Sequence, residues 1–134
     1  MNEQLVRAIY AARARGDLGA VRDLLDDDIV WHEPGDEDYS GDHRGADAVI
    51  GLLERLQRTT EGTFELEPTG FLVTADHVAA AIRWSARRGD ASVEGYEIAV
   101  YRIAGAKIAE AWFHPDGYDP DALSAVFSPG ENGS

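Results

Sequence analysis

Hydrophobic residues recur at helical spacing in two segments near the N-terminus and in one central segment. In the first 25 residues, apolar side chains fall three or four positions apart, in two runs separated by Gly16 and Asp17. Glycine commonly ends a helix and aspartate commonly caps the next one, so we predict two helices that meet here. The same spacing over residues 46–56 predicts a third helix, with one apolar face packed on a sheet.

Short apolar segments typical of β-strands make up most of the remaining chain. Residues 28–34 (DIVWHEP) predict a short first strand, and the three aspartates at 26–28 predict a solvated turn just before it. Beyond Gly62, we predict four long strands joined by hairpin turns, over residues 64–73, 78–86, 93–103 and 108–114. A last apolar segment at 119–127 predicts a short helix.

This order of elements predicts the class of fold. Helices followed by long antiparallel strands indicate an α+β domain, which we expect to be a cone-shaped barrel. In it, the N-terminal helices pack on a strongly curved, mainly antiparallel sheet and leave an apolar cavity inside. We expect one domain over residues 1–127 and a flexible C-terminal tail over residues 128–134.

Composition limits the partners and the chemistry. The chain carries 25 acidic and 12 basic side chains, a net charge of −13 that repels nucleic acids and anionic membranes. It has no cysteine, which excludes disulfides, thiolate metal ligands and cysteine nucleophiles. No export signal, membrane-spanning segment or nucleotide-binding glycine motif occurs, so we expect a cytoplasmic protein without an organic cofactor.

Ionisable side chains at strand ends and within apolar strands are the candidates for catalysis. They are Glu33, His43, Glu97 and His114. Histidine exchanges protons near neutral pH, so His114, at the end of the last strand, is the first candidate for proton transfer. Five further side chains are candidates for contact with a substrate: His32, Trp31, Arg83, Tyr101 and Trp112.

Each candidate also has a purely structural interpretation. His32 and Glu33 are neighbours on one strand, so at most one of them faces the interior unless the strand bulges. Strand alternation places Glu97 on one face with Tyr101, where an ion pair with Arg83 of an adjacent strand would make it structural. His43 lies in a predicted loop, where a surface position is the default.

Four motifs, in their order along the chain, resemble a known family. They are the Gly16 and Asp17 break, residues 31–35 (WHEPG), residues 41–45 (GDHRG) and residues 107–112 (KIAEAW). Together they resemble the nuclear transport factor 2-like superfamily and, within it, the SnoaL-like polyketide cyclase group. The resemblance implies a cone-shaped α+β barrel that is frequently dimeric through its sheet. Its relatives include cyclases, ketosteroid isomerases, limonene epoxide hydrolases, dehydratases and non-catalytic binders.

The resemblance also bears on particular residues. Glu33 before Pro34 is similar to the catalytic carboxylate of ketosteroid isomerases. Tyr10, however, is one residue from the position of their tyrosine, and Ala99 stands where their second acid would be, which argues against steroid isomerisation. The arginine and aspartate spacing of limonene epoxide hydrolases occurs only in a predicted turn, at residues 88–90.

We therefore expect an enzyme of the SnoaL-like type, acting without a cofactor on an apolar carbonyl or polyketide-like substrate. General acid/base catalysis would isomerise, cyclise or dehydrate it, with His114 or His43 as proton shuttle and Glu33 or Glu97 as base. We also expect a homodimer through the sheet. One alternative is a non-catalytic ligand-binding module of the same fold. A second is a divalent-metal site built from His32, His43, Glu97 and His114.

Overall fold

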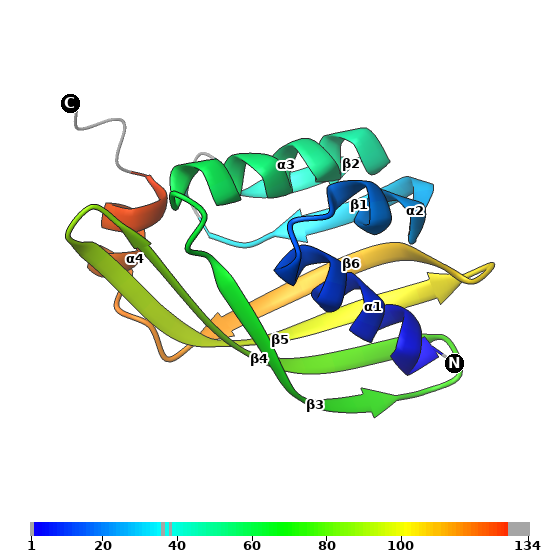
Figure 1. Ribbon diagram of the computed structural model, residues 1–134. Helices are drawn as coiled ribbons and strands as arrows, with labels where there is room; N and C mark the ends of the chain where they lie inside the picture. Colours follow the sequence, from blue (N-terminus) through cyan, green and yellow to red (C-terminus); the bar gives the residue numbers. More distant parts are fainter. Residues whose placement is uncertain (1, 36, 38, 129–134) are drawn as a thin grey trace.

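The computed structural model describes residues 2–35, 37 and 39–128. Its N-terminal half contains α1 (Asn2–Ala14), α2 (Leu18–Asp23), β1 (Leu25–Glu33), β2 (Gly41–Arg44) and α3 (Ala46–Thr59). The remainder contains β3 (Glu65–Val73), β4 (His77–Arg88), β5 (Ala91–Ala104), β6 (Lys107–Asp116) and α4 (Pro120–Phe127) (Figure 1). Most of the segment predicted to be a flexible tail, residues 129–134, lies outside the described residues.

All six strands join in one sheet, in the order β2-β1-β6-β5-β4-β3. Strand β1 runs parallel to β6, and every other neighbouring pair is antiparallel. The sheet is strongly curved but not closed, with β2 and β3 at its edges. The predicted α+β cone with a mainly antiparallel sheet is therefore confirmed, and its wall is open rather than a complete barrel.

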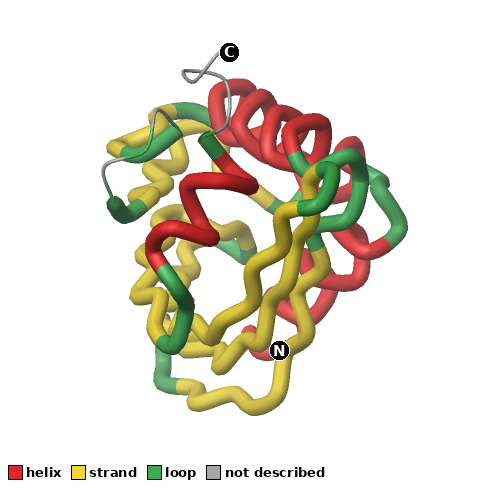
Figure 2. Tube along the Cα trace, turned by 90° about the vertical axis from the view of Figure 1, so that its left-hand side faces the viewer, coloured by secondary structure: helices red, strands yellow, loops and turns green. Residues whose placement is uncertain are grey.

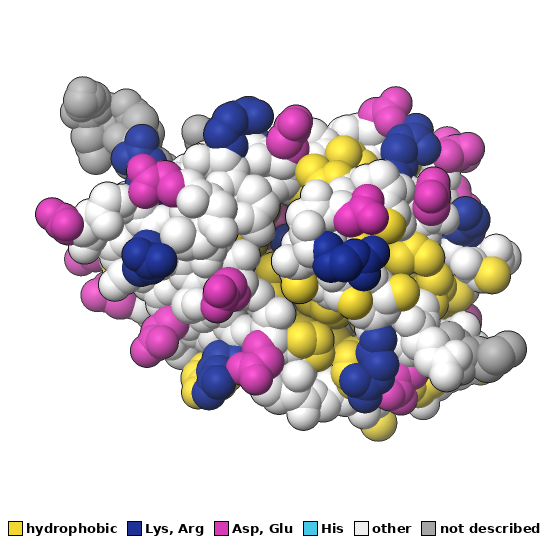
Figure 3. Space-filling model, in the orientation of Figure 1, with side chains coloured by type: hydrophobic (Ala, Val, Ile, Leu, Met, Phe, Trp, Pro, Cys, Tyr) yellow, Lys and Arg dark blue, Asp and Glu magenta, His cyan; other side chains and the backbone are white. Residues whose placement is uncertain are grey.

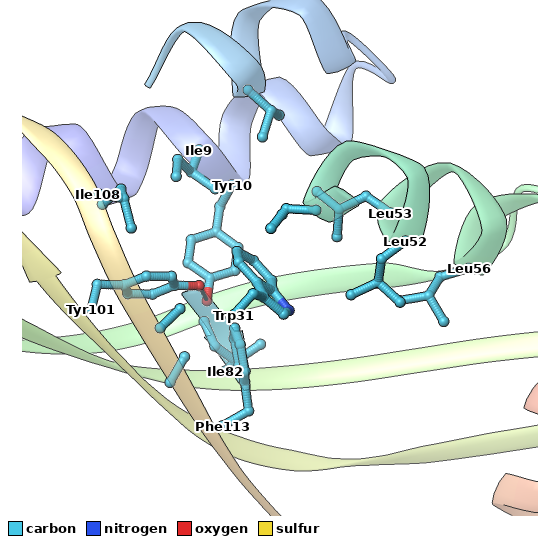
Figure 4. Close-up of a cluster of buried hydrophobic side chains, with 14 of the residues drawn as sticks. Ile9, Tyr10, Trp31, Leu52, Leu53, Leu56, Ile82, Tyr101, Ile108 and Phe113 are labelled. Atoms are coloured by element: carbon cyan, nitrogen blue, oxygen red, sulfur yellow. Dashed lines mark hydrogen bonds between the residues drawn. The ribbon is translucent and has the colours of Figure 1, made fainter. Parts of the chain in front are cut away.

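Helices cover the concave face of this sheet. Helix α1 contacts β3 and β4, and α3 contacts β1 and β2. At one end, α4 packs on β4 and β5 and lies across the mouth of the curved sheet (Figure 2). The largest side chains buried between the layers include Ile9, Trp31, Leu53 and Tyr101 (Figure 4). Removing these apolar surfaces from water is the main force that holds helices and sheet together.

Two segments differ from the predictions made from sequence. The three aspartates predicted as a turn belong to β1, where a bulge between Leu25 and Val30 leaves Asp27 and Asp28 exposed. Residues 41–45, predicted as a loop, contribute β2, which pairs with β1. This pairing satisfies backbone groups along one side of β1, which is why a short polar segment becomes a strand.

Among residues 2–35, 37 and 39–128, no helix combines the length and the apolar composition needed to cross a bilayer.

A candidate active site at the end of the cone

An interior cavity of about 170 Å³ lies at the end of the cone that α4 covers. Apolar side chains from the sheet, from α3 and α4 and from the segment before β3 supply most of its wall, among them Trp31, Leu53, Phe64, Phe113 and Phe127. The charged side chains that line it, within the described part of the chain, are Arg13, Glu33 and Glu97. A small apolar cavity with a few ionisable groups is typical of a ligand-binding site.

Glu33 reaches the cavity because of the alternation of β1. Ile29 and Trp31 are buried on the inner face, and Glu33 follows at the same spacing of two. The Trp31 Nε1–H donates a hydrogen bond to Glu33 Oε1 at 3.0 Å. Burial raises the pKa of Glu33, while that hydrogen bond and the positive charges of Arg13 and His43 oppose the shift. These three contacts favour the ionised form of Glu33.

Glu97 enters the same cavity from β5. It shares the inner face of that strand with the fully buried Ala99 and Tyr101. Burial, and secondarily the negative charge of Glu33, raises the pKa of Glu97 to about 7, against the opposing charge of Arg13. Near neutral pH, Glu97 is therefore protonated in about half of the molecules. The site can both accept and donate a proton in that range.

Two tyrosines lie behind the carboxylates. The hydroxyl oxygens of Tyr10 and Tyr101 are 2.6 Å apart, and Figure 4 shows them pointing at each other. Burial raises the pKa of both phenols, and the charge of Glu97 raises it further. Both phenols therefore stay protonated at neutral pH, and they keep the deep end of the interior polar but uncharged.

Arg83 is not the partner of Glu97. The register of β4 on β5 sets Arg83 opposite Tyr96 and Ile82 opposite Glu97, so Arg83 lies on the outer face. There its Nη2 is 2.8 Å from Glu67 Oε1 of β3. The predicted ion pair between Arg83 and Glu97 is therefore wrong, and Arg83 does not line the interior cavity.

His32 also lies on the outer face, because its neighbour Glu33 faces inward. Its Nδ1 is 2.7 Å from Asp42 Oδ1, and its Nε2 is 2.7 Å from Glu110 Oε2. The ring stacks on Trp112, with centroids 5.7 Å apart. The hydrogen bonds to Glu110 and then to Asp42 raise the pKa of His32. We predicted that His32 and Trp112 contact a substrate in the cavity, but neither side chain lines it.

The remaining histidines do not line the cavity either. Strand β6 sends Phe113 and Pro115 toward the cavity, so His114 between them is exposed on the outer face. His43 sits opposite Trp31, and its Nε2–H donates to the Tyr39 carbonyl oxygen at 2.7 Å. Of the predicted side chains, the structure brings Glu33, Glu97 and Trp31 together at the cavity and leaves His114 outside it.

The predicted metal ligands are separated in the same way. His32 and His114 belong to the outer face of the sheet, whereas Glu97 points inward. Within the described residues, no three histidine, aspartate or glutamate side chains come close enough to share an ion. The metal-site hypothesis therefore loses its geometric basis.

Two side chains near the cavity are not among the candidates that the sequence indicates. Tyr10 is one residue from the position that the resemblance implies, and no motif singles out Arg13. Their spacing of three residues in α1 places both on the face that packs on the sheet. That spacing was the available signal, and it was obscured because arginine near a helix end is ordinarily a solvated residue.

Comparisons with known proteins agree with this architecture. Residues 6–111 match the SnoaL-like domain family. An uncharacterized protein of Mycobacterium tuberculosis is 30% identical over 105 residues, which are 78% of this chain and 80% of that protein. The chain therefore belongs to the SnoaL-like domain family.

Solved structures show the same fold. Bal32a, from a soil-derived mobile gene cassette, is 28% identical with a TM-score of 0.86, covering 94% of this chain and 95% of that one. An NTF2-like protein from Burkholderia xenovorans is 23% identical with a TM-score of 0.72, covering 95% of each chain. TerC, co-crystallized with polyporic acid, is 18% identical with a TM-score of 0.79, covering 94% of this chain and 97% of that one.

Proposed function

We propose that this protein is a cofactor-independent enzyme that moves a proton on an apolar carbonyl or polyketide-like substrate bound in the interior cavity. The observation that carries the proposal is the pair Glu33 and Glu97, which line one small apolar space, with the pKa of Glu97 raised to about 7. Perturbed carboxylates that share a cavity are a common mark of acid/base chemistry.

The environments of the two carboxyl groups assign their roles. The Trp31 indole N–H and nearby positive charge favour the anion of Glu33, so Glu33 acts as the base. Glu97, with its pKa raised to about 7, carries a proton in about half of the molecules at neutral pH and acts as the acid. Glu33 removes a proton from the carbon next to the substrate carbonyl, and the C–H electron pair moves into the enol as Glu97 protonates the carbonyl oxygen.

The enol then has two outcomes. If the substrate carries a conjugated double bond, the enol is a dienol, and return of the proton from Glu33 to its far carbon gives an isomer. Alternatively, attack of the enol carbon on a second carbonyl closes a ring, and that carbonyl oxygen takes up the proton while the enol returns to a ketone. Each outcome conserves atoms and needs no oxidant or reductant. The mainly apolar wall lowers the local dielectric constant, which strengthens the electrostatic effect of both carboxyl groups. Membership of the SnoaL-like family and the co-crystallized polyporic acid of TerC support a cyclic carbonyl compound as the substrate class.

The experiment is exchange of α-hydrogens of β-tetralone for deuterium, followed by NMR in deuterated buffer. Wild-type protein is expected to accelerate exchange, and Glu33→Gln to reduce it about 100-fold, the size of one general-base contribution. Glu97→Gln is expected to reduce exchange and to remove the pH dependence near 7. Glu54→Gln, on the exposed face of α3, is the control. Binding of β-tetralone without acceleration would favour a non-catalytic binding module instead.

A homodimer through the sheet also remains a proposal. Four large hydrophobic side chains are exposed in the part of the chain that the structure describes: Leu72 to 71%, Val73 to 44%, Tyr96 to 58% and Ile98 to 46%. Tyr96 and Ile98 lie on the outer face of β5, the side away from the cavity. Exposed hydrophobic residues of this size are typical of an interface, and a two-fold axis would set the same residues of both copies together.

A further inference from the structure

The interior cavity adjoins a second, larger hollow. This outer cleft has a volume of about 1050 Å³ and is lined by α1, β3, β4 and β5. On this face of the molecule, hydrophobic side chains are visible beside α1, between scattered charged side chains (Figure 3). Four residues line both spaces: Arg13, Phe64, Leu66 and Trp84. They mark the boundary through which a ligand longer than the inner cavity would extend.

Arg13 is the charged residue at that boundary, and its guanidinium is unpaired. Among the described residues, no hydrogen-bond acceptor or carboxylate lies within bonding distance of it. The other arginines of the outer cleft do have partners, since Arg15 is 3.6 Å from Asp17 and Arg83 is 2.8 Å from Glu67. The guanidinium lies over the ring of Phe64, with its Cζ 5.8 Å from the ring centroid.

The positive charge of Arg13 extends into the interior. It opposes the rise in pKa that burial causes in both carboxyl groups that line the cavity and in both buried phenols. Beside it, the indole N–H of Trp84 is buried without an acceptor among the described residues. The boundary therefore offers hydrogen-bond donors and positive potential, although the protein as a whole carries a charge of −13.

We propose that Arg13 binds an anionic oxygen of the ligand, so that the natural ligand is an acidic aromatic carbonyl compound held across the boundary. Its carboxylate or ionised hydroxyl contacts the guanidinium, and its ring lies against Phe64 and Trp84. A guanidinium suits this role because it presents a planar set of donors that match two oxygens at once. The placement of the carbonyl group against Glu33 and Glu97 rests on the proposed function, whereas the anion site does not.

The test compares two probes of nearly equal shape, naphthoate and naphthamide, by isothermal titration calorimetry. Wild-type protein is expected to bind naphthoate roughly tenfold more tightly, the difference that one charge-assisted contact supplies. Arg13→Gln is expected to abolish that preference while leaving naphthamide binding within about twofold. Arg13→Lys is expected to keep part of it, because the charge remains but the planar set of donors does not.

Arg7→Gln is the matched control. Arg7 belongs to the same helix and also lies over an aromatic ring, with its Cζ 4.3 Å from the Phe71 centroid, but it lines neither hollow. Naphthoate binding is expected to be unchanged in this variant. In wild-type protein, naphthoate is expected to bind more tightly as the pH falls through about 7, because protonation of Glu97 removes a nearby negative charge.

Equal affinity of the two probes for wild-type protein would overturn the inference, as would failure of naphthoate to bind at millimolar concentration. An equal loss of both probes in Arg13→Gln would overturn it too, since Arg13 would then only shape the cavity. The proposed function fails separately. If Glu33→Gln leaves deuterium exchange unchanged while the preference for naphthoate depends on Arg13, the anion site stands and the catalytic role does not.

Discussion

The hydroxyl oxygens of Tyr10 and Tyr101 lie 2.6 Å apart although the residues are 91 positions apart in the chain. The bond joins α1 to β5 through the centre of the molecule, and the two rings meet edge to face with centroids 6.2 Å apart. Each hydroxyl is the partner of the other. The loss of one hydroxyl therefore leaves the other buried without that bond.

Replacement of Tyr10 or Tyr101 by phenylalanine is expected to lower the free energy of unfolding by about 1–2 kcal/mol, the cost of one orphaned buried hydroxyl. The double variant is expected to lose less than the sum of the single losses, because it leaves no unpaired group. Urea denaturation of the four proteins measures the coupling. Strictly additive losses would show that the two hydroxyls do not depend on each other.

Replacement of Glu97 by glutamine is expected to stabilise the protein at high pH. Folding raises the pKa of Glu97 to about 7 from an ordinary value of 4.5, so the folded state binds more protons between these values. Stability is therefore lost as the pH rises through this window, and Glu97→Gln escapes the loss. The gain is expected to be roughly 3 kcal/mol above pH 7 and absent below about pH 4.5, by thermal unfolding at several pH values. A gain independent of pH would contradict this origin.

Replacement of His32 by glutamine is expected to destabilise the protein mainly at low pH. Folding raises the pKa of His32 because Glu110 and Asp42 hold its two ring nitrogens. The stabilisation is full below the unfolded pKa of 6.5 and is lost as the pH rises through the folded value. Chemical denaturation across this range measures it. His114→Gln, at an exposed position on the same face, is the control, and an equal pH response in both variants would refute the assignment.

Replacement of Gly95 by alanine is expected to disturb the boundary between the two hollows. A Cβ atom at this position would lie 2.9 Å from Cζ2 of Trp84 and 2.9 Å from Cβ of Tyr118, closer than packed atoms approach. Relief of the overlap moves the Trp84 ring, which lines both hollows. We expect a loss of about 2 kcal/mol of stability, with a change in tryptophan fluorescence. Gly51→Ala, where space is open, is the control.

Replacement of Ile98 by glutamate tests the proposed dimer. The side chain is 46% exposed on the outer face of β5, so a charge there is tolerated in a monomer but disfavoured at a buried interface. Sedimentation velocity is expected to show a dimer for wild-type protein and a monomer for Ile98→Glu. Ala48→Glu, at an exposed position of α3, is expected to remain dimeric. A monomeric wild-type protein at the same concentration would refute the proposal.

The fold followed from the sequence because its main signals are periodic. Spacings of three and four residues marked α1 and α3, and alternation marked the long strands, since a helix or strand must bury one face. Short polar segments gave no such signal. Strand β2 forms because β1 offers it free backbone hydrogen-bonding groups. Residues 41–44 by themselves carry no pattern that reveals this partner.

The candidate site was only partly accessible from sequence. Alternation correctly grouped Glu97 with Tyr101, and the same rule applied to β1 required that only one of His32 and Glu33 face inward. It did not say which one, because that depends on the register of a strand whose bulge the sequence does not reveal. For β6, the proton-transfer chemistry of histidine favours His114, whereas strand alternation around the apolar Phe113 places His114 on the outer face.

Helix α4 forms part of the cavity wall through Leu123 and Phe127, yet contributes none of its ionisable groups. It is held to the rest of the molecule partly by Glu37, which accepts hydrogen bonds from the hydroxyls of Ser124 and Ser128. The proposed acid/base pair, Glu33 and Glu97, and this part of the cavity wall therefore belong to separate segments of the polypeptide. Redesign of the eight residues Pro120–Phe127 would change the size and shape of the cavity without replacing either carboxyl group.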